Sequence, residues 1–367
     1  MRTISHQQQG MLLCRVRHLA WVLAGALCYM RCVQPRDIRV LWVQEFVRDA
    51  AFSEAALNLA RITETEHATR GTVFSSAALS CDYSSGSMRI VRAKEISKMC
   101  WYANDYKRIL RQVPRSKRSH DFVVCDRDCV QADTHVFALA KSRKIVDARN
   151  RTVSVLPVNV GRHFKWVAYA FRDPLPYDGK LPVALWRGVS TNDCWNLHPN
   201  VGKHLPECAR RNLVTRWALD NSTKVDVGIT EVVQVTPELG IRLKSLLKEP
   251  MKVKAMLKYK YLISGEGNDV ATNLKWALAS NSVVFMPPPT RESFILESKL
   301  KPWVHYVPLE HTMEDLEAKV SLCEMNRSRC RRISEAATLY MRAFSTRRKL
   351  FRLGAQVYEQ HFRQLVM

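Results

Sequence analysis

Hydrophobic positions along the chain follow two different patterns. Apolar residues three or four apart over 37–62 predict an amphipathic helix, and a second helix is expected over 94–113. Residues 63–86 are polar and rich in Ser and Thr, which is typical of a loop. Short apolar runs predict buried strands at 87–92, 121–125, 136–140, 153–156 and 183–186.

The clearest unit lies between residues 259 and 286. It is predicted to contain a strand at 259–264, a tight loop at 265–269, a helix at 270–279 and a second strand at 282–286. Three prolines follow at 287–289 and stop the chain sharply. This β–loop–α–β pattern favours an α/β fold with a parallel sheet.

The proline-rich loop at 174–179 (PLPYDG) marks a predicted domain boundary. An N-terminal domain is therefore expected at 37–173 and a C-terminal domain at 180–345, followed by a basic terminal helix at 346–367. Within the second domain, helices are expected at 312–323 and 330–344.

Residues 1–36 resemble a targeting segment, because a polar, Arg-bearing stretch precedes the apolar run 19–30. Twelve helical residues span about 18 Å, less than the ~30 Å hydrocarbon core of a bilayer. The segment therefore predicts a secretory signal or a signal anchor, with a buried core helix as the alternative. The first reading implies the lumen of the endoplasmic reticulum or Golgi, with membrane attachment through 19–30 left open.

The cysteines and glycosylation sequons are compatible with the secretory pathway but are weak evidence for it. Eight of the 11 cysteines follow residue 32, and they could form disulfides or remain buried thiols. None forms a C-x-x-C pair, so no structural zinc site is predicted. Glycosylation sequons begin at Asn150, Asn221 and Asn326.

The charge balance is strongly basic, with 57 Lys and Arg against 34 Asp and Glu, a net charge of +23. Such an excess favours an anionic partner, although a solvated basic surface would have the same composition. No RNP motif, zinc-finger spacing or basic zipper occurs in the sequence, so no nucleic-acid partner is expected.

Gly265 and Gly267 follow a predicted strand and precede a predicted helix. Ligands of open α/β sheets bind at this end of the strands. Glycines permit positive φ or close backbone approach, and a helix N-terminus favours an anion. With Lys275 one turn into the helix, the unit suits a diphosphate. A Gly-x-Gly turn that only connects strand and helix is the alternative.

Asp126 and Asp128 follow the predicted strand at 121–125. A carboxylate there could act as a general base on a hydroxyl, or it could form a loop ion pair with Arg127. Three other residues could also be proposed as bases: Glu292, Glu297 and His305.

The stretch 259–309 resembles the signature region of glycosyltransferase family 90. Residues 185–188 (LWRG) and 121–128 (DFVVCDRD) resemble two further strands of that family, and the likeness covers roughly 85–345. It implies a GT-B fold of two facing Rossmann-like domains, a UDP-sugar in the cleft, inversion at the anomeric carbon and no required metal or other cofactor. It also implies that Asp128 is the catalytic base. The residues expected to bind the donor are Arg187, Gly188, Gly265, Glu266, Gly267, Asn268, Asp269, Thr272, Asn273 and Lys275.

The sequence departs from the family pattern at two positions. The animal O-glucosyltransferases carry an arginine where this chain has Asn273, and Val130 replaces the proline after the Asp motif. The diphosphate charge would then be met by Arg187 and Lys275, together with Arg210 or Arg211.

These observations predict an inverting transferase that moves glucose or xylose from a UDP-sugar to a hydroxyl of a glycan or protein. The alternative is a non-enzymatic, basic polyanion-binding protein on a decayed transferase fold, which the net charge of +23 and Asn273 favour.

Overall fold

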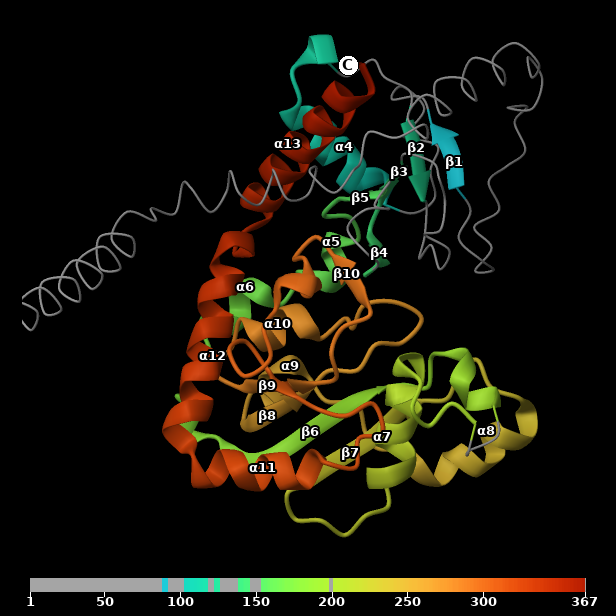
Figure 1. Ribbon diagram of the computed structural model, residues 1–367, viewed down its shortest axis with the longest axis vertical. Helices are drawn as coiled ribbons and strands as arrows, with labels where there is room; N and C mark the ends of the chain where they lie inside the picture. The colour runs from blue at the N-terminus through green and yellow to red at the C-terminus, as the bar shows by residue number, and fades with distance from the viewer. Residues whose placement is uncertain are drawn as a thin grey trace, which may run out of the picture. The chain divides into compact units, whose positions relative to one another are not determined.

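The structure is a computed structural model that describes residues 88–91, 102–117, 122–125, 138–145, 153–197 and 201–366 (Figure 1). All of these residues belong to one compact unit, which spans 49–367. The predicted helix over 37–62 and the apolar segment 19–30 lie outside the described residues.

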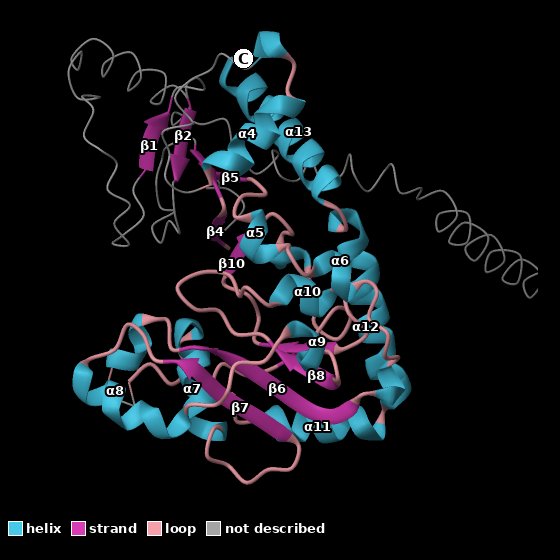
Figure 2. Cartoon of the chain, turned by 180° about the vertical axis from the view of Figure 1, so that it is seen from behind, coloured by secondary structure: helices cyan, strands magenta, loops and turns pink. Residues whose placement is uncertain are grey.

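A five-stranded, all-parallel sheet with strand order β11-β9-β8-β6-β7 forms the centre of the C-terminal half (Figure 2). Its strands are β6 (Leu181–Val189), β7 (Val225–Glu231), β8 (Tyr259–Ile263), β9 (Val283–Met286) and β11 (Val307–Pro308). All four residues of β9 are buried, as is typical of a parallel strand that is covered on both faces. This burial explains why β8 and β9 could be predicted from short apolar runs in the sequence.

Helices connect the parallel strands and cover the sheet. They are α7 (Ala209–Trp217), α8 (Pro237–Leu243), α9 (Val253–Met256), α10 (Leu274–Leu278), α11 (Leu316–Met325) and α12 (Arg327–Met341). Helix α7 packs against β7, α11 against β6 and α12 against β9. Short 3-10 turns occur at Arg115–Lys117, Tyr177–Gly179, Asp193–Asn196, Pro206–Cys208, Lys244–Leu246, Glu297–Lys299 and Arg342–Phe344.

A second sheet lies earlier in the chain, with strand order β1-β2-β3-β5. Strand β1 (Met88–Val91) is antiparallel to β2 (Phe122–Cys125), whereas β3 (Ala138–Ala140) and β5 (Val153–Val155) run parallel to β2. One residue after β3, β4 (Ser142–Lys144) leaves this sheet and pairs antiparallel with β10 (Arg291–Ser293).

The remaining helices are α4 (Ala103–Gln112), α5 (Val160–His163), α6 (Val167–Ala170) and α13 (Arg347–Val366). Helix α13 follows the five-stranded half in sequence but packs against α4. Its Gly354 lies so close to Pro157 that an added Cβ would be 2.8 Å from the proline ring. Among the described helices, none combines the length and apolar character needed to cross a bilayer.

Each predicted strand from 87–92 to 282–286 is observed, but the prediction of a helix over 270–279 was wrong in its extent. Helix α10 covers only Leu274–Leu278. The Asn273 side chain donates to the Ile263 carbonyl and accepts from Ser264, which ties the residues before the helix to the end of β8. The α/β class with a parallel sheet is confirmed, and two facing Rossmann-like domains stay a prediction.

Candidate functional site

A cleft of about 1320 Å³ opens at the carboxyl ends of β6 and β8. One side is formed by residues 186–189, by the start of α7 and by the loop after β8. The other side is formed by residues from the first half of the chain, including Tyr102, Asn159, Arg162 and His163. The predicted donor-binding residues that line the cleft are Arg187, Gly188, Glu266, Gly267, Asn268, Asp269, Thr272 and Asn273.

Gly267 is needed at its position because two side chains lie against its backbone. A Cβ added there would be 2.5 Å from an Arg210 guanidinium nitrogen and 2.6 Å from the Thr191 hydroxyl. Positive φ is not the reason, since Gly202 is the described glycine with positive φ. At Gly265, an added Cβ would meet nothing closer than 3.9 Å. A glycine in such a turn can be required by positive φ or by the close approach of other atoms to its backbone. Close approach is the explanation at Gly267.

Arg210 is the side chain that makes this close approach. Its guanidinium donates to the carbonyl oxygens of Gly265 (2.7 Å) and Val189 (3.3 Å) and to the Thr191 hydroxyl. These acceptors are uncharged, and no described carboxylate forms an ion pair with Arg210. Its Nε is buried without a hydrogen-bond partner. Arg210 thus brings to the cleft wall a positive charge that no carboxylate in the described part of the chain neutralises through an ion pair.

A second cation faces Arg210. Burial, and after it the charge of Arg162, lowers the pKa of Arg210 to about 10, although the charge of Glu266 partly offsets both effects. Arg162 lies on α5, is exposed and also lines the cleft. Two like charges that repel each other across a cleft are a suitable setting for an anion.

The other predicted cations are already paired. Arg187 donates to both carboxylate oxygens of Asp226, at 2.9 and 2.7 Å, and Lys248 donates to the same carboxylate at 2.9 Å. Although burial opposes ionisation, these bonds lower the pKa of Asp226. Arg187 therefore contributes a wall of the cleft, but its charge is matched by Asp226.

Lys275 is fully buried, and its ammonium lies 3.0 Å from the Glu297 carboxylate. It is not among the residues that line the cleft. Arg211 is also buried and donates to the carbonyls of Cys194 and Val201, both at 2.9 Å. Of the two arginines considered for the diphosphate, Arg210 is the one on the cleft.

The acidic residues of the loop after β8 hold it in place. Glu266 accepts from the backbone N–H groups of Thr290 (3.0 Å) and Arg291 (3.2 Å) and from the Thr290 hydroxyl. Asp269 forms a buried ion pair with Lys141 at 2.5 Å. Burial opposes ionisation of Asp269, but Lys141 lowers the pKa of this carboxyl below its ordinary value. The loop is therefore attached both to the chain before β10 and to the segment between β3 and β4.

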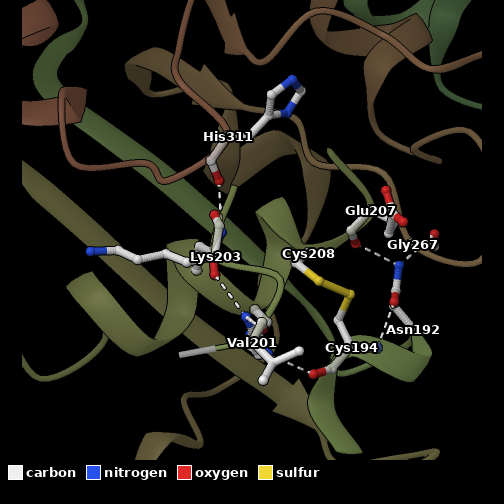
Figure 3. Close-up of a disulfide and its surroundings, with 10 residues drawn as sticks. Asn192, Cys194, Val201, Lys203, Glu207, Cys208, Gly267 and His311 are labelled. Atoms are coloured by element: carbon white, nitrogen blue, oxygen red, sulfur yellow. Dashed lines mark hydrogen bonds between the residues drawn. A yellow bond between two sulfur atoms is a disulfide. The ribbon is translucent and has the colours of Figure 1, made fainter. Parts of the chain in front are cut away.

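A disulfide between Cys194 and Cys208 supports the same loop (Figure 3). The Asn192 side chain accepts from the Cys194 N–H at 2.9 Å and donates to the carbonyls of Glu207 (2.7 Å) and Gly267 (3.2 Å). Cys208 precedes Arg210 by two residues. The disulfide thus holds together the two segments that position Gly267 and Arg210.

A second disulfide joins Cys323 to Cys330. The expectation that the later cysteines can form disulfides is confirmed for these four. Cys81, Cys100, Cys125 and Cys129 have no described sulfur chemistry, because their side chains lie outside the described residues.

Arg162 and His163 were not predicted as site residues. His163 is buried and lines the cleft, and burial together with Lys275, Lys141 and Arg162 lowers its pKa well below the ordinary value. A signal was present, because both residues follow the predicted strand at 153–156 by fewer than ten positions. Ligand-binding residues often occupy that end of a strand.

The candidate bases differ in what the structure describes. Asp126 and Asp128 lie outside the described residues, so the role of Asp128 stays a prediction. Glu292 and Glu297 are buried in ion pairs with Arg143 and Lys275. His305 accepts from the Lys301 N–H at 2.9 Å and packs against Tyr340. These three alternatives are thus engaged in structural contacts.

Comparison with known proteins places this geometry in context. The model of a family described as Glycosyl transferase family 90 matches residues 154–352, more than half of the 367-residue chain. The match includes every predicted donor-binding residue and does not reach Asp128.

Three relatives illustrate the range of similarity. The O-glucosyltransferase LpsA of Dichelobacter nodosus is 31% identical over 244 residues, which cover 66% of this chain and 66% of that protein. Protein O-glucosyltransferase 2 of Danio rerio is 33% identical over 88 residues, 23% of this chain and 17% of that protein. Uncharacterized protein 035R of Invertebrate iridescent virus 3 is 27% identical over 183 residues, 47% of this chain and 16% of that protein. The chain thus spans 66% of LpsA and less than a fifth of the other two.

Proposed function

The chain belongs to glycosyl transferase family 90, and from this membership we propose that it transfers a sugar from a UDP-sugar to a hydroxyl of a glycan or protein. Glucose is the favoured sugar, because two of the relatives carry O-glucosyltransferase in their names. Xylose is the second candidate. The proposed arrangement is of the GT-B type, with the donor on the five-stranded half and the acceptor entering from the first half.

The observation that carries the proposal is the facing pair of Arg210 and Arg162. Neither guanidinium forms an ion pair with a described carboxylate, and each repels the other. A diphosphate between them would supply the missing negative charge through charge-assisted hydrogen bonds. The animal O-glucosyltransferases have an arginine where this chain has Asn273. Arg210 on α7 and Arg162 on α5 would supply the positive charge that is missing at that position.

The proposed reaction inverts the anomeric carbon. The acceptor hydroxyl oxygen attacks that carbon while Asp128 takes the hydroxyl proton, and the bond from the carbon to the diphosphate oxygen breaks. The sugar passes through an oxocarbenium-like transition state. Negative charge grows on the leaving UDP, where Arg210 and Arg162 would stabilise it. Since the protein supplies these cations, the reaction is expected to proceed without a metal ion.

The location of the protein is a proposal of the same kind. An Arg-bearing stretch followed by the apolar run 19–30 would direct the chain into the endoplasmic reticulum or Golgi lumen. The disulfides Cys194–Cys208 and Cys323–Cys330 would persist in that oxidising compartment. Endoglycosidase treatment of protein from a eukaryotic host should change its mobility, and a uniformly cytosolic, unmodified protein would contradict the proposal.

The mechanism can be tested at Asp128. The Asp128→Asn variant keeps the side-chain shape but removes the base, so transfer should fall by about 10²–10⁴-fold. UDP binding should stay close to that of the wild type, because the donor contacts lie on other residues. Asp126→Asn is the matched control and should be milder. Equal activity of wild type and Asp128→Asn in acceptor transfer would remove Asp128 from the mechanism.

A non-enzymatic, polyanion-binding protein is the competing candidate, and the net charge of +23 favours it. Incubation of the purified protein with a panel of UDP-sugars distinguishes the two, because a transferase slowly hydrolyses its donor. UDP release from one member of the panel would identify the donor. Binding of polyanions with no UDP release and no transfer would support the competing candidate.

A further inference from the structure

The histidine at the end of α5 is a polar side chain that borders the cleft and lies almost entirely inside the protein. His163 is the last residue of α5 and is only 4% exposed, yet it belongs to the cleft lining. The Asn159 carbonyl accepts from the N–H groups of Arg162 and His163, both at 3.1 Å. A carboxylate oxygen of Asp105 accepts from the Val160 N–H at 2.9 Å. These bonds fix the backbone that carries the imidazole.

The Nδ1 atom of this imidazole is buried and has no hydrogen-bond partner among the described residues. Buried nitrogens without a partner are uncommon in native proteins and call for a functional explanation. In a histidine, the bond made by one ring nitrogen determines which of the two carries the proton. Because Nδ1 of His163 makes no such bond here, the ring can present either a donor or an acceptor to the cleft.

The surroundings of His163 select the uncharged form of the ring. Burial, followed by the charges of Lys275, Lys141 and Arg162, lowers the pKa of His163 well below its ordinary value. A phosphate oxygen binds a cation such as Arg162 more strongly than it binds a neutral imidazole. A hydroxyl can both donate and accept, so it suits a neutral ring that can do the same. The chemistry of His163 therefore favours a hydroxyl-bearing ligand over an anionic one.

The position of His163 favours the sugar of the donor. Arg162, the preceding residue, is assigned to the diphosphate, and the transferred sugar is bonded to that diphosphate. Lys275 belongs to α10, the helix after the loop that carries Gly267, and it lies close enough to lower the pKa of His163. His163 is therefore near both the proposed diphosphate site and a helix of the donor-binding half.

We propose that His163 binds a hydroxyl of the transferred sugar and so contributes to the choice of the sugar donor. The inference rests on the proposed function and deepens it by assigning a specificity-determining residue. A site that binds a hydroxyl discriminates against an analogue without it, because the protein group is then left unpaired. His163 would recognise one particular hydroxyl, whereas Arg162 and Arg210 would recognise the diphosphate that every UDP-sugar shares.

The test measures the binding of UDP, of UDP-glucose and of the analogues of UDP-glucose that each lack one sugar hydroxyl. If the wild type hydrolyses UDP-xylose instead, the same series is made from UDP-xylose. The wild type should bind one analogue about tenfold more weakly than the complete donor. His163→Leu should bind the complete donor about tenfold more weakly and should no longer distinguish that analogue from it. UDP itself should bind to the wild type and the variant alike.

Two further variants separate hydrogen bonding from packing. His163→Gln keeps a group that can donate and accept, so it should retain part of the preference, and it gives the same comparison if His163→Leu does not fold. His204→Gln replaces an exposed histidine outside the cleft lining and should match the wild type with every ligand. If His163→Leu weakens UDP and all UDP-sugars by the same factor, His163 only packs there and the inference is overturned.

The outcomes also separate this inference from the proposed function. If His163 distinguishes no analogue of the donor but its replacement raises the KM for the acceptor, the residue belongs to the acceptor site. That result would overturn the inference and leave the transferase proposal intact. A wild type that binds neither UDP nor any UDP-sugar would contradict the transferase proposal and the inference with it. A preference for one sugar hydroxyl that depends on His163 would support both.

Discussion

Two cations near the loop after β8 behave in opposite ways. Lys275 is buried beside Glu297, at 3.0 Å, with both side chains 1% exposed. Arg210 lies on the cleft wall and donates only to uncharged oxygens within the described structure. From the sequence, both residues were candidates to bind the diphosphate of the donor. The difference shows that the partner of a cation, rather than its distance from a glycine-rich turn in the sequence, determines whether its charge is available to a ligand.

The contrast extends to the rest of the cleft. Arg187 with Asp226 and Lys141 with Asp269 are paired cations that fix the walls. Arg162 and Arg210 both line the cleft and repel each other, and neither forms an ion pair with a carboxylate of the described residues. Paired charges therefore make the frame of the cleft, and unpaired charges make the surface that an anionic ligand would contact.

The largest effect is expected at Lys275. Lys275→Met leaves the Glu297 carboxylate buried without its partner, which typically costs about 3–5 kcal/mol. Arg210→Met should change the free energy of unfolding far less, because no described carboxylate loses its partner. Denaturant unfolding of both variants measures the difference. The double variant Lys275→Met/Glu297→Gln should recover part of the loss, because glutamine removes the unpaired charge and keeps an acceptor for the buried Ser293 N–H. A double variant no more stable than Lys275→Met would contradict the idea that the unpaired carboxylate causes the loss.

The next effect concerns the disulfide Cys194–Cys208. Replacing both cysteines with serine should lower the free energy of unfolding by about 3 kcal/mol, as expected for a loop of about 15 residues. It should also weaken UDP binding, because Asn192 and Arg210 lose their common support. Removal of Cys323–Cys330, which is remote from the cleft lining, is the matched control and should lower stability alone. Equal UDP affinity in the two double variants would separate the disulfide from the donor site.

A smaller effect distinguishes the two glycines of the loop. In Gly267→Ala the new Cβ meets the Arg210 guanidinium at 2.5 Å, so Arg210 must shift, and UDP affinity should fall by about tenfold. In Gly265→Ala the nearest atom is 3.9 Å away, and affinity should hardly change. Calorimetric titration with UDP compares them. Similar losses at both positions would mean that backbone conformation, and not close approach to Arg210, explains the glycines.

The smallest effect is the pH dependence that His163 confers. Burial and the nearby cations keep its pKa well below 6.5. Just below pH 6.5 the His163 imidazole therefore stays neutral in the folded protein, whereas it becomes protonated in the unfolded chain. Stability should therefore fall as the pH drops below 6.5, by about 1 kcal/mol over the first pH unit.

The His163→Gln variant should lose that part of the pH dependence. The negative charge of bound UDP should offset the charge of Arg162 and raise the pKa of His163 toward its ordinary value. A pKa that NMR titration finds unchanged by UDP would place the anion away from this part of the cleft.

The strands were predictable because the parallel strands of the five-stranded sheet are buried, and burial leaves an apolar run in the sequence. Because ligands bind at the carboxyl ends of parallel strands, the predicted strand ends also identified Gly267 and Asn268, which line the cleft. The full extent of the helix over 270–279 was not predictable from periodicity, because Asn273 bonds to the end of β8 and delays the helix. Strand β7 was not predicted, although Val225, Val227 and Ile229 alternate with polar residues or glycine in the pattern of a half-buried strand.

Which cations form ion pairs could not be predicted from the sequence either. Lys275 meets Glu297 and Arg187 meets Asp226 across 22 and 39 positions of the chain. Nothing in the local pattern distinguishes these cations from Arg210. Arg162 was missed although it closely follows the predicted strand at 153–156, because the four-residue helix α5 that carries it has no recognisable motif.

The most direct test of the account compares the binding of UDP and uridine to the wild type and to the double variant Arg162→Gln/Arg210→Gln. Two charge-assisted contacts should make UDP bind more tightly than uridine by on the order of 10²–10⁴-fold in the wild type. In the double variant that preference should shrink to about tenfold or less, while the affinity for uridine stays the same. A wild type that binds UDP and uridine equally well, or a double variant that keeps the full preference, would contradict the claim that these unpaired arginines hold the diphosphate.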